Sequence, residues 1–157
     1  QVNILFNYYN RAEWKYDASS GTYLRWIEQM KGDENEGDLW MVPLLDRVTG
    51  KQLAFNNLII IFTHYDELSP SRYEIEIMKN IKGKRALFFR NGQMFEGLWK
   101  VPHDQAPIQF FDLSGQPFLL KPGNTWIVLA DDNSIFNKKE NGAWELFFML
   151  ASNTSNT

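Results

Sequence analysis

Cysteine is absent from this chain of 157 residues. The sequence therefore excludes disulfides, thiolate metal sites and a cysteine nucleophile. Histidine is scarce as well, because His64 and His103 are the only two and lie far apart in the chain. Neither belongs to a His-x-x-x-His or His-x-His pattern, so we expect no zinc site and no other required metal. No cofactor is expected either, because the chain has no phosphate-binding glycine loop.

Long apolar runs and an excess of positive charge are also absent. The longest apolar run, "NLIIIF" at 57–62, has the length of a strand and falls far short of the ~20 residues that span a bilayer. The net charge of −3 gives no basic footprint for nucleic acid or a membrane surface. Basic and aromatic residues do alternate at 79–90, as in single-strand binders. Their charges fall on different faces, however, and we expect no nucleic-acid partner.

Hydrophobic residues are plentiful by contrast. The chain is 44% hydrophobic and 15% aromatic, which excludes a disordered chain. Its length suits one domain, which we expect to span 1–150, with a flexible polar tail at 151–157. The chain begins at Gln1 with neither Met nor a signal peptide, and we interpret it as a fragment or processed form of a longer protein.

Short runs of β-branched and aromatic residues recur along the chain, separated by turn residues. Some runs alternate and predict one wet face, whereas 58–62 and 126–129 are apolar on both faces and predict strands covered on both sides. The sequence predicts an all-β fold, either an antiparallel two-sheet sandwich or a closed barrel, with at most one or two short helices. The predicted strands are 2–9, 13–17, 22–29, 38–44, 52–64, 72–78, 85–90, 93–100, 108–112, 117–121, 125–130 and 143–150.

Three connections, at 17–21, 46–50 and 112–115, begin with Asp and end with Gly. An Asp carboxylate accepts hydrogen bonds from backbone N–H groups ahead of it, and Gly supplies a positive φ. Catalytic carboxylates or calcium ligands are the alternative, but turn chemistry accounts for all three at once. The acidic stretch 33–38 resembles the start of a calcium loop, yet its glycine comes too early and Leu44 stands where the final Glu belongs. It predicts a solvated loop with weak calcium binding at most.

The segment "RNGQMFEGLWK" at 90–100 contains the clearest turn. Asn91 and Gly92 between two strand-like runs predict a type I′ hairpin, whose register places Ala86 opposite Gly97 on an apolar face. We expect that face to lie in the core, with a neighbouring ring filling the gap beside Gly97.

The opposite face of this hairpin is apolar except for Glu96 and Arg85. We expect these two to form a partly exposed ion pair worth ~0–1 kcal/mol. The alternative is that Glu96 is a general acid or base whose pKa is raised by apolar neighbours. Nothing in the sequence places a second carboxylate or a histidine beside it, which disfavours that alternative.

Two strands of lower hydrophobicity carry the candidate ligand contacts. Because side chains alternate along a strand, Trp14 and Tyr16 lie on one side of their strand, and Tyr23 and Arg25 lie on one side of theirs. If exposed, the rings can stack on a sugar, and Arg25 can orient a carboxylate or a hydroxyl. The alternative is that the rings close the end of a barrel. Asn57 opens an apolar strand, and we expect its side chain to bond the backbone of a neighbouring loop.

Four stretches together resemble one known family, the C-terminal domain of the YerB-type lipoproteins of bacteria. The resemblance runs from about residue 8 to 130. The stretches are "WKYDASSGTYLRW", "DRVTGKQLAFNNLIII", "GKRALFFRNGQMFEGLWK" and "FFDLSGQPFLLKPGNTWIVL".

Individual residues match motifs of this family. Tyr23 and Arg25 match its Y-x-R element, and Asn57 begins its N-hydrophobic strand. The hairpin and the G-x-T-W ending are matched by Gly92, Gly97, Trp99, Gly123, Thr125 and Trp126. A departure occurs at 83–85, where Gly-Lys-Arg replaces the expected G-x-G and argues against a glycine-lined site.

The resemblance implies an exported parent protein, anchored in the membrane through a lipidated cysteine upstream and carrying a larger N-terminal domain. It implies an extracytoplasmic location and contact with the membrane only through that anchor. It supplies no reaction, because the family has no assigned chemistry.

Two functions remain open. The first is a non-catalytic binding or interaction module, with a cell-wall polysaccharide, another envelope protein or the protein's own N-terminal domain as partner. The second is an accessory part of a cell-wall-acting enzyme whose site needs the N-terminal domain, which a common cleft lined by Tyr23, Arg25, Asn57 and Glu96 would favour. No catalytic residue or metal ligand is assigned. The candidate ligand-binding residues are Trp14, Tyr16, Tyr23, Arg25, Asn57 and Glu96.

Overall fold

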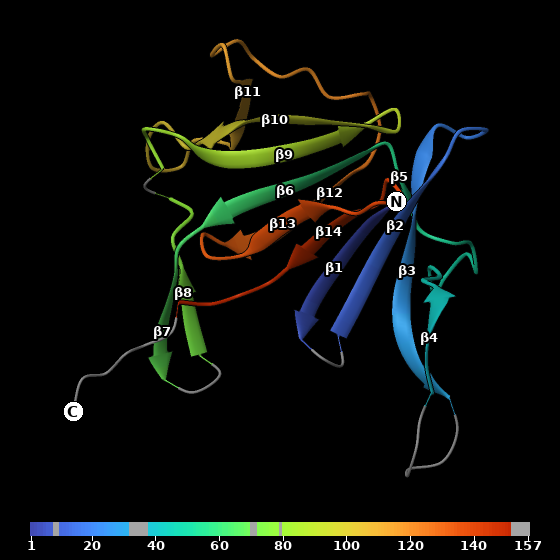
Figure 1. Ribbon diagram of the computed structural model, residues 1–157. Helices are drawn as coiled ribbons and strands as arrows, with labels where there is room; N and C mark the ends of the chain where they lie inside the picture. The colour runs from blue at the N-terminus through green and yellow to red at the C-terminus, as the bar shows by residue number, and fades with distance from the viewer. Residues whose placement is uncertain (8–9, 32–37, 70–71, 79, 152–157) are drawn as a thin grey trace.

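The computed structural model describes residues 1–7, 10–31, 38–69, 72–78 and 80–151. Within these ranges the regular structure consists of 14 strands (Figure 1), which confirms the all-β prediction. No helix in the described residues is long and apolar enough to cross a membrane. All but the first residue of the predicted tail and nearly all of the acidic stretch 33–38 lie outside the described residues.

Two sheets face each other, and a two-stranded hairpin projects beside them (Figure 1). The seven-stranded sheet has the order β13 (Ile135–Lys138), β14 (Trp144–Phe147), β1 (Val2–Asn7), β2 (Asn10–Asp17), β3 (Thr22–Lys31), β4 (Asp38–Pro43), with β5 (Ala54–Phe55) pairing with β3. The five-stranded sheet has the order β11 (Gln109–Asp112), β10 (Gln93–Lys100), β9 (Lys84–Arg90), β6 (Asn57–Thr63), β12 (Thr125–Asp131). The projecting hairpin is β7 (Tyr65–Ser69) with β8 (Arg72–Ile75).

The sheets are open at their edges, so the fold is a sandwich and not a closed barrel. Most neighbouring strands are antiparallel, as predicted, but β1 pairs with β14 and β6 pairs with β12 in parallel. The sequence did not predict β7 and β13. The run 117–121 forms no strand, and Pro117 makes a single bridge to Phe111.

The strand β6 separates two hydrophobic cores. The inner core lies between the two sheets, because its members come from β1, β2 and β3 as well as from β6, β9 and β12. The second core lies on the far face of the five-stranded sheet, covered by residues such as Phe110 and Phe118. Alternate side chains of β6 belong to different cores, Ile60 to the inner and Ile59 to the second. This confirms that 58–62 is covered on both sides.

The β9–β10 hairpin has the predicted turn and register. Asn91 has φ 52° and Gly92 has φ 76°, as a type I′ turn requires, and Ala86 lies opposite Gly97. The apolar face of the hairpin belongs to the second core. A Cβ added to Gly97 would lie 2.6 Å from Cε2 of Phe88, so an aromatic ring fills the space beside this glycine.

The three Asp-to-Gly connections are turns of the expected chemistry. The Asp17 carboxylate accepts backbone hydrogen bonds from Ser19 at 3.1 Å and Ser20 at 3.2 Å, and Gly21 has φ +66°. Hydrogen bonds from the Ser20 and Ser19 hydroxyls lower the pKa of Asp17 to about 2. Equivalent bonds form at 46–50 and 112–115, which confirms the turn interpretation.

Candidate functional site

The six candidate residues separate into three surroundings. Trp14 is fully buried, Tyr23 and Arg25 are 2% and 8% exposed, and all three project from β2 and β3 between the two sheets, with Tyr16 half-buried beside them. Asn57 is buried at the start of β6. Glu96 is exposed on β10. The two pairs that alternation predicted, Trp14 with Tyr16 and Tyr23 with Arg25, are therefore confirmed, and the structure adds that both pairs share one face. Their binding role stays a prediction.

Arg25 is held against aromatic rings and not against an anion. Its guanidinium carbon lies 4.1 Å from the centre of the Trp14 ring and 5.4 Å from that of Trp126. Nη1 donates to the carbonyl of Trp26, but Nε is buried and has no hydrogen-bond acceptor. No carboxylate of the described residues forms an ion pair with this arginine. Burial lowers the pKa of Arg25 to about 10, so the side chain is charged at neutral pH.

Trp14, like Arg25, has a buried donor without an acceptor. Its Nε1 has no hydrogen-bond partner, and Trp14 lies directly across the β2–β3 ladder from Arg25. A buried donor without an acceptor costs about 1–3 kcal/mol, and a charged group costs more. Two neighbouring buried donors without acceptors form a local constellation that an incoming oxyanion could satisfy.

The backbone at Arg25 is fully paired, unlike its side chain. Its N–H donates to Leu53 at 2.9 Å, and its carbonyl accepts from Leu44 at 3.0 Å and from the Gln52 side chain at 2.9 Å. At this residue β3 changes its neighbour from β5 to β4. The guanidinium is therefore mounted on a rigid strand position.

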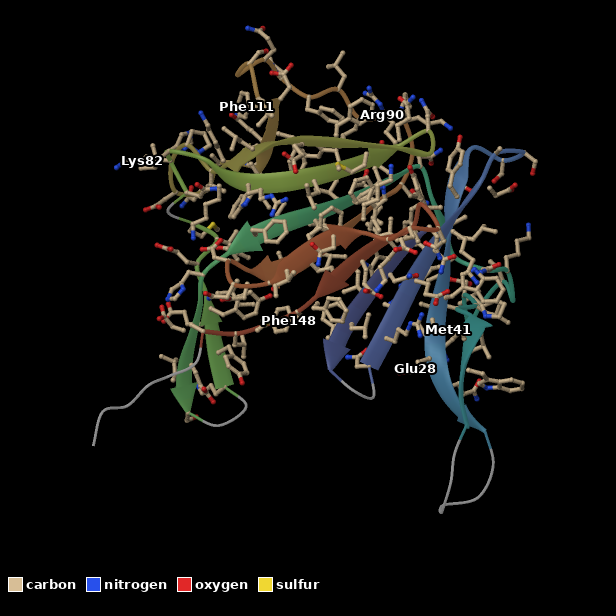
Figure 2. The ribbon with its side chains drawn as sticks, viewed as in Figure 1. Glu28, Met41, Lys82, Arg90, Phe111 and Phe148 are labelled. Carbon is tan, nitrogen blue, oxygen red and sulfur yellow. The ribbon has the colours of Figure 1, made fainter. Side chains whose placement is uncertain are left out.

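Tyr16 and Tyr23 hold the tip of the hairpin. Their ring centres lie 5.1 Å apart, and the Gly92 N–H donates to the Tyr23 hydroxyl at 3.0 Å. A Cβ on Gly92 would lie 2.9 Å from Cδ1 of Tyr16. Burial raises the pKa of Tyr23 to about 12. These contacts connect the turn between β9 and β10 to the seven-stranded sheet. The turn directly follows Arg90, which is labelled in Figure 2.

Asn57 has the structural contacts that its position predicted. Its Nδ2 donates to the Lys121 carbonyl at 2.8 Å and to the Thr125 hydroxyl at 3.1 Å, while its Oδ1 accepts from the Lys121 N–H at 2.9 Å. The predicted bond to a loop backbone is therefore confirmed. These contacts hold the segment before β12 against the start of β6.

Glu96 forms the predicted ion pair with Arg85. Oε1 of Glu96 and Nη2 of Arg85 are 3.2 Å apart, and the two side chains are 48% and 46% exposed. None of the hydrogen bonds and ion pairs of Tyr23, Arg25, Asn57 and Glu96 joins one of the four to another. Direct contacts therefore do not assemble the common cleft that would favour an enzyme.

The histidines take part in short-range contacts only. Nε2 of His64 lies 2.9 Å from Oδ1 of Asp66, and Nδ1 of His103 lies 2.9 Å from the carbonyl of Asp104. Among the residues that the structure describes, no group of three or more His, Asp or Glu side chains could hold a metal ion.

An apolar groove of about 570 Å³ lies at another part of the surface, between β1, β13 and the end of the last strand. Phe148, labelled in Figure 2, lines it together with Leu5, Phe6, Ile135, Asn137, Phe147 and Met149. The groove can pack an apolar side chain, but Asn137 is the only polar residue among the described residues that line it. It therefore has little means of orienting a polar ligand.

Sequence reasoning missed Trp126 as a neighbour of Arg25. The run "WIVL" indicated only a strand covered on both faces, and the ring lies over Arg25 because β12 pairs in parallel with β6. A parallel partner distant in the chain leaves no local signal in the sequence.

Comparisons with known proteins identify a family and a related structure. A family model described as "Protein of unknown function (DUF3048) C-terminal domain" matches residues 2–127. The crystal structure of YerB protein from Bacillus subtilis is 25% identical, with a TM-score of 0.58, over 77% of this chain. The match covers 36% of the YerB chain, so this chain spans about a third of its relative. None of the curated proteins matches.

Proposed function

This chain belongs to the family of the C-terminal domain of the DUF3048 proteins of unknown function, and we propose that it is a non-catalytic binding module of an exported, membrane-anchored bacterial lipoprotein. In this proposal Arg25 receives a carboxylate of the ligand. Trp14 and Trp126 enclose the contact, and Tyr16 and Tyr23 hold the neighbouring hairpin in place. The partner is a component of the cell envelope.

The observation that carries the proposal is the buried guanidinium of Arg25, whose Nε has no acceptor and which forms no ion pair with the described residues. A buried charge without a counter-ion destabilises a fold, and replacing buried ionic groups by apolar ones is often neutral or stabilising. Two aromatic contacts and one carbonyl offset only part of the hydration that the Arg25 guanidinium loses on burial. Where water is excluded, a cation–π contact contributes about 2 kcal/mol or more. A ligand carboxylate would supply the missing partner through charge-assisted hydrogen bonds.

A second candidate is an accessory role in a cell-wall-acting enzyme. It is favoured by the length of the solved relative, of which this chain covers 36%, because a further domain could supply reacting groups. Arg25 would then orient a substrate carboxylate for those groups. Turnover of wall fragments by a longer protein, lost on removal of its other domain, would support this candidate.

The test of the binding proposal is titration of the chain while Trp fluorescence is followed, since Trp14 and Trp126 flank the arginine. The probes are peptidoglycan fragments with free carboxylates, the same fragments with those carboxylates converted to amides, wall polysaccharides, and short acidic peptides. At least one carboxylated probe should bind, and loss of the carboxylate should weaken it about tenfold or more.

Arg25→Met is the informative variant, and Arg85→Met is its matched control. Both arginines lie over an aromatic ring, Arg85 at 4.8 Å from Phe62, but Arg85 already has Glu96 as its partner. Carboxylate-dependent binding should disappear in the first variant and persist in the second, with both folded. Equal binding of the acid and amide probes, or full binding by Arg25→Met, would overturn the proposal.

A further inference from the structure

The strand β12 is an edge of the five-stranded sheet, and β6 is its only neighbour among the strands that the structure describes. A strand directs alternate N–H and C=O groups to each side, so about half of those of β12 face away from β6. The central residues, Trp126–Ala130, make no backbone hydrogen bond to any other described segment on that side. β12 therefore offers a backbone edge that a further strand can pair with.

The edges formed by β11, β13 and β4 are protected, which sets β12 apart from them. β11 is covered, because its Phe110 carbonyl accepts from Phe118 and its Asp112 N–H donates to the carbonyl of Gln116. β13 is 4 residues long and ends at a lysine, and β4 ends at a proline. Shortness, lysine and proline are the features that block edge pairing. β12 has 7 residues, "TWIVLAD", and contains neither lysine nor proline. Its only charged residue is the final Asp131.

Arg25, which has no ion-pair partner among the described residues, lies near the ring of Trp126 on this same strand. Trp126, Val128 and Ala130 direct their side chains into the inner core, and the Trp126 ring is 5.4 Å from the Arg25 guanidinium. A strand added to β12 would lie ~4.8 Å from it, with alternate side chains directed into the same interior. A residue opposite Trp126 would thus come within reach of Arg25.

We propose that the ligand is an extended polypeptide segment that adds to β12 as the next strand of the five-stranded sheet and places a carboxylate side chain on Arg25. The inference rests on the proposed function and specifies the class of its ligand. Backbone pairing supplies affinity in this mode, and side-chain contacts supply the choice of sequence. The buried positive charge selects an acidic residue over a neutral or basic one.

Charge distinguishes this occupant from a second copy of the chain. An antiparallel pairing of β12 with itself about Val128 would place Trp126 opposite Ala130, Ile127 opposite Leu129 and Thr125 opposite Asp131, the single acid of β12. Side chains alternate along a strand, so the Thr125–Asp131 pair projects to the face opposite to that of Trp126 and brings no carboxylate to Arg25. The proposed segment belongs to another protein of the cell envelope.

The experiment uses a short capped peptide of alternating Val and Thr with one central Glu, titrated into the chain. Residue-resolved amide hydrogen exchange should show new protection at alternate residues of β12 and no change in β13. Replacing the peptide Glu by Gln should weaken binding about tenfold or more. Methylating the peptide amides on one edge of the strand should abolish binding, whereas methylation on the opposite edge should leave it intact.

The outcomes separate this inference from the function on which it rests. Arg25-dependent binding of wall fragments without protection of β12 would overturn strand addition and leave the binding module standing. Equal binding of the Glu and Gln peptides would overturn the placement of a peptide carboxylate on Arg25 and would leave the wall-fragment test of the binding module unaffected. No binding of the peptide up to ~1 mM, or concentration-dependent dimers that protect β12 without peptide, would overturn strand addition. Binding of the peptide to this chain but not to a longer protein that contains it would place the segment within that protein and overturn the assignment to a separate partner.

Discussion

On one side of the inner core, the Gly92 N–H donates to the Tyr23 hydroxyl and the neighbouring strands β9 and β10 are paired on both sides. On the other side, Arg25 and Trp14 carry buried donors without acceptors, and β12 lacks a second neighbour. We call these the hairpin side and the arginine side. Folding alone explains the first, because buried polar groups are normally paired. The second leaves buried donors and a strand edge that the fold itself does not satisfy.

The largest effect is expected on the hairpin side, at Gly97. A Cβ there would meet the backbone carbonyl of Phe111 and lie 2.6 Å from the Phe88 ring. Backbone cannot move aside cheaply, so Gly97→Ala should lower the free energy of unfolding by about 3 kcal/mol. The control is Gly50→Ala, where nothing lies within 4 Å and only the φ of +67° is unfavourable, at about 1 kcal/mol. Urea unfolding measures both, and equal losses would contradict the packing argument.

The next largest effect is expected at Asn57. Asn57→Leu leaves both backbone groups of Lys121 and the Thr125 hydroxyl without their partner. We expect a loss of about 2 kcal/mol, with binding retained in the folded fraction. Asn137→Leu, at an exposed position on β13, should change stability by less than about 0.5 kcal/mol. An unchanged melting temperature for Asn57→Leu would show that the hydrogen bonds contribute nothing.

A smaller, pH-dependent effect is expected at Tyr23. Tyr23→Phe leaves the Gly92 N–H unpaired and should cost about 1 kcal/mol at neutral pH. Burial raises the pKa of Tyr23 from 10.0 to about 12. The folded state therefore binds the proton more tightly, and this stabilisation is present below pH 10 and is lost as pH rises towards 12.

The free energies of unfolding of the wild type and of Tyr23→Phe should therefore converge above pH 10. Arg25, whose pKa is lowered to about 10, and Tyr65, whose pKa is raised to about 12, titrate in the same range. Both are present in the wild type and in Tyr23→Phe, so the difference between the two isolates Tyr23. A difference that stays constant from pH 8 to 11.5 would contradict the assignment. Unfolding by urea at fixed pH provides the measurement.

The hairpin side could be predicted from sequence because its signals are local. Asn91 and Gly92 specify the turn, and the turn specifies the register that brings Ala86 opposite Gly97. The Asp-to-Gly turns and the Arg85–Glu96 pair follow from short spacings in the same way. The all-β class followed from the length and spacing of the apolar runs.

The arginine side could be predicted only in part. Alternation placed Trp14 and Arg25 on faces that proved to be shared, but it could not show that the face is buried. Burial depends on the parallel β6–β12 pairing, which joins segments far apart in the chain. The candidate set therefore combined Arg25 with Glu96, whose only charged partner among the described residues is Arg85.

The smallest effect, and the one that defines the comparison, is expected for Arg25→Met. Methionine keeps the length and the contact with Trp14 while removing a desolvated charge that no anion neutralises. The loss of the cation–π contacts, about 2 kcal/mol or more at a desolvated site, opposes the gain from removing the buried charge. We expect the free energy of unfolding to change by less than about 0.5 kcal/mol or to rise. Arg85→Met, which breaks an exposed ion pair, should lose no more than about 1 kcal/mol. A loss of about 3 kcal/mol in Arg25→Met, measured by urea unfolding beside Arg85→Met, would show that Arg25 serves the fold, and the two sides of the core would then not differ in kind.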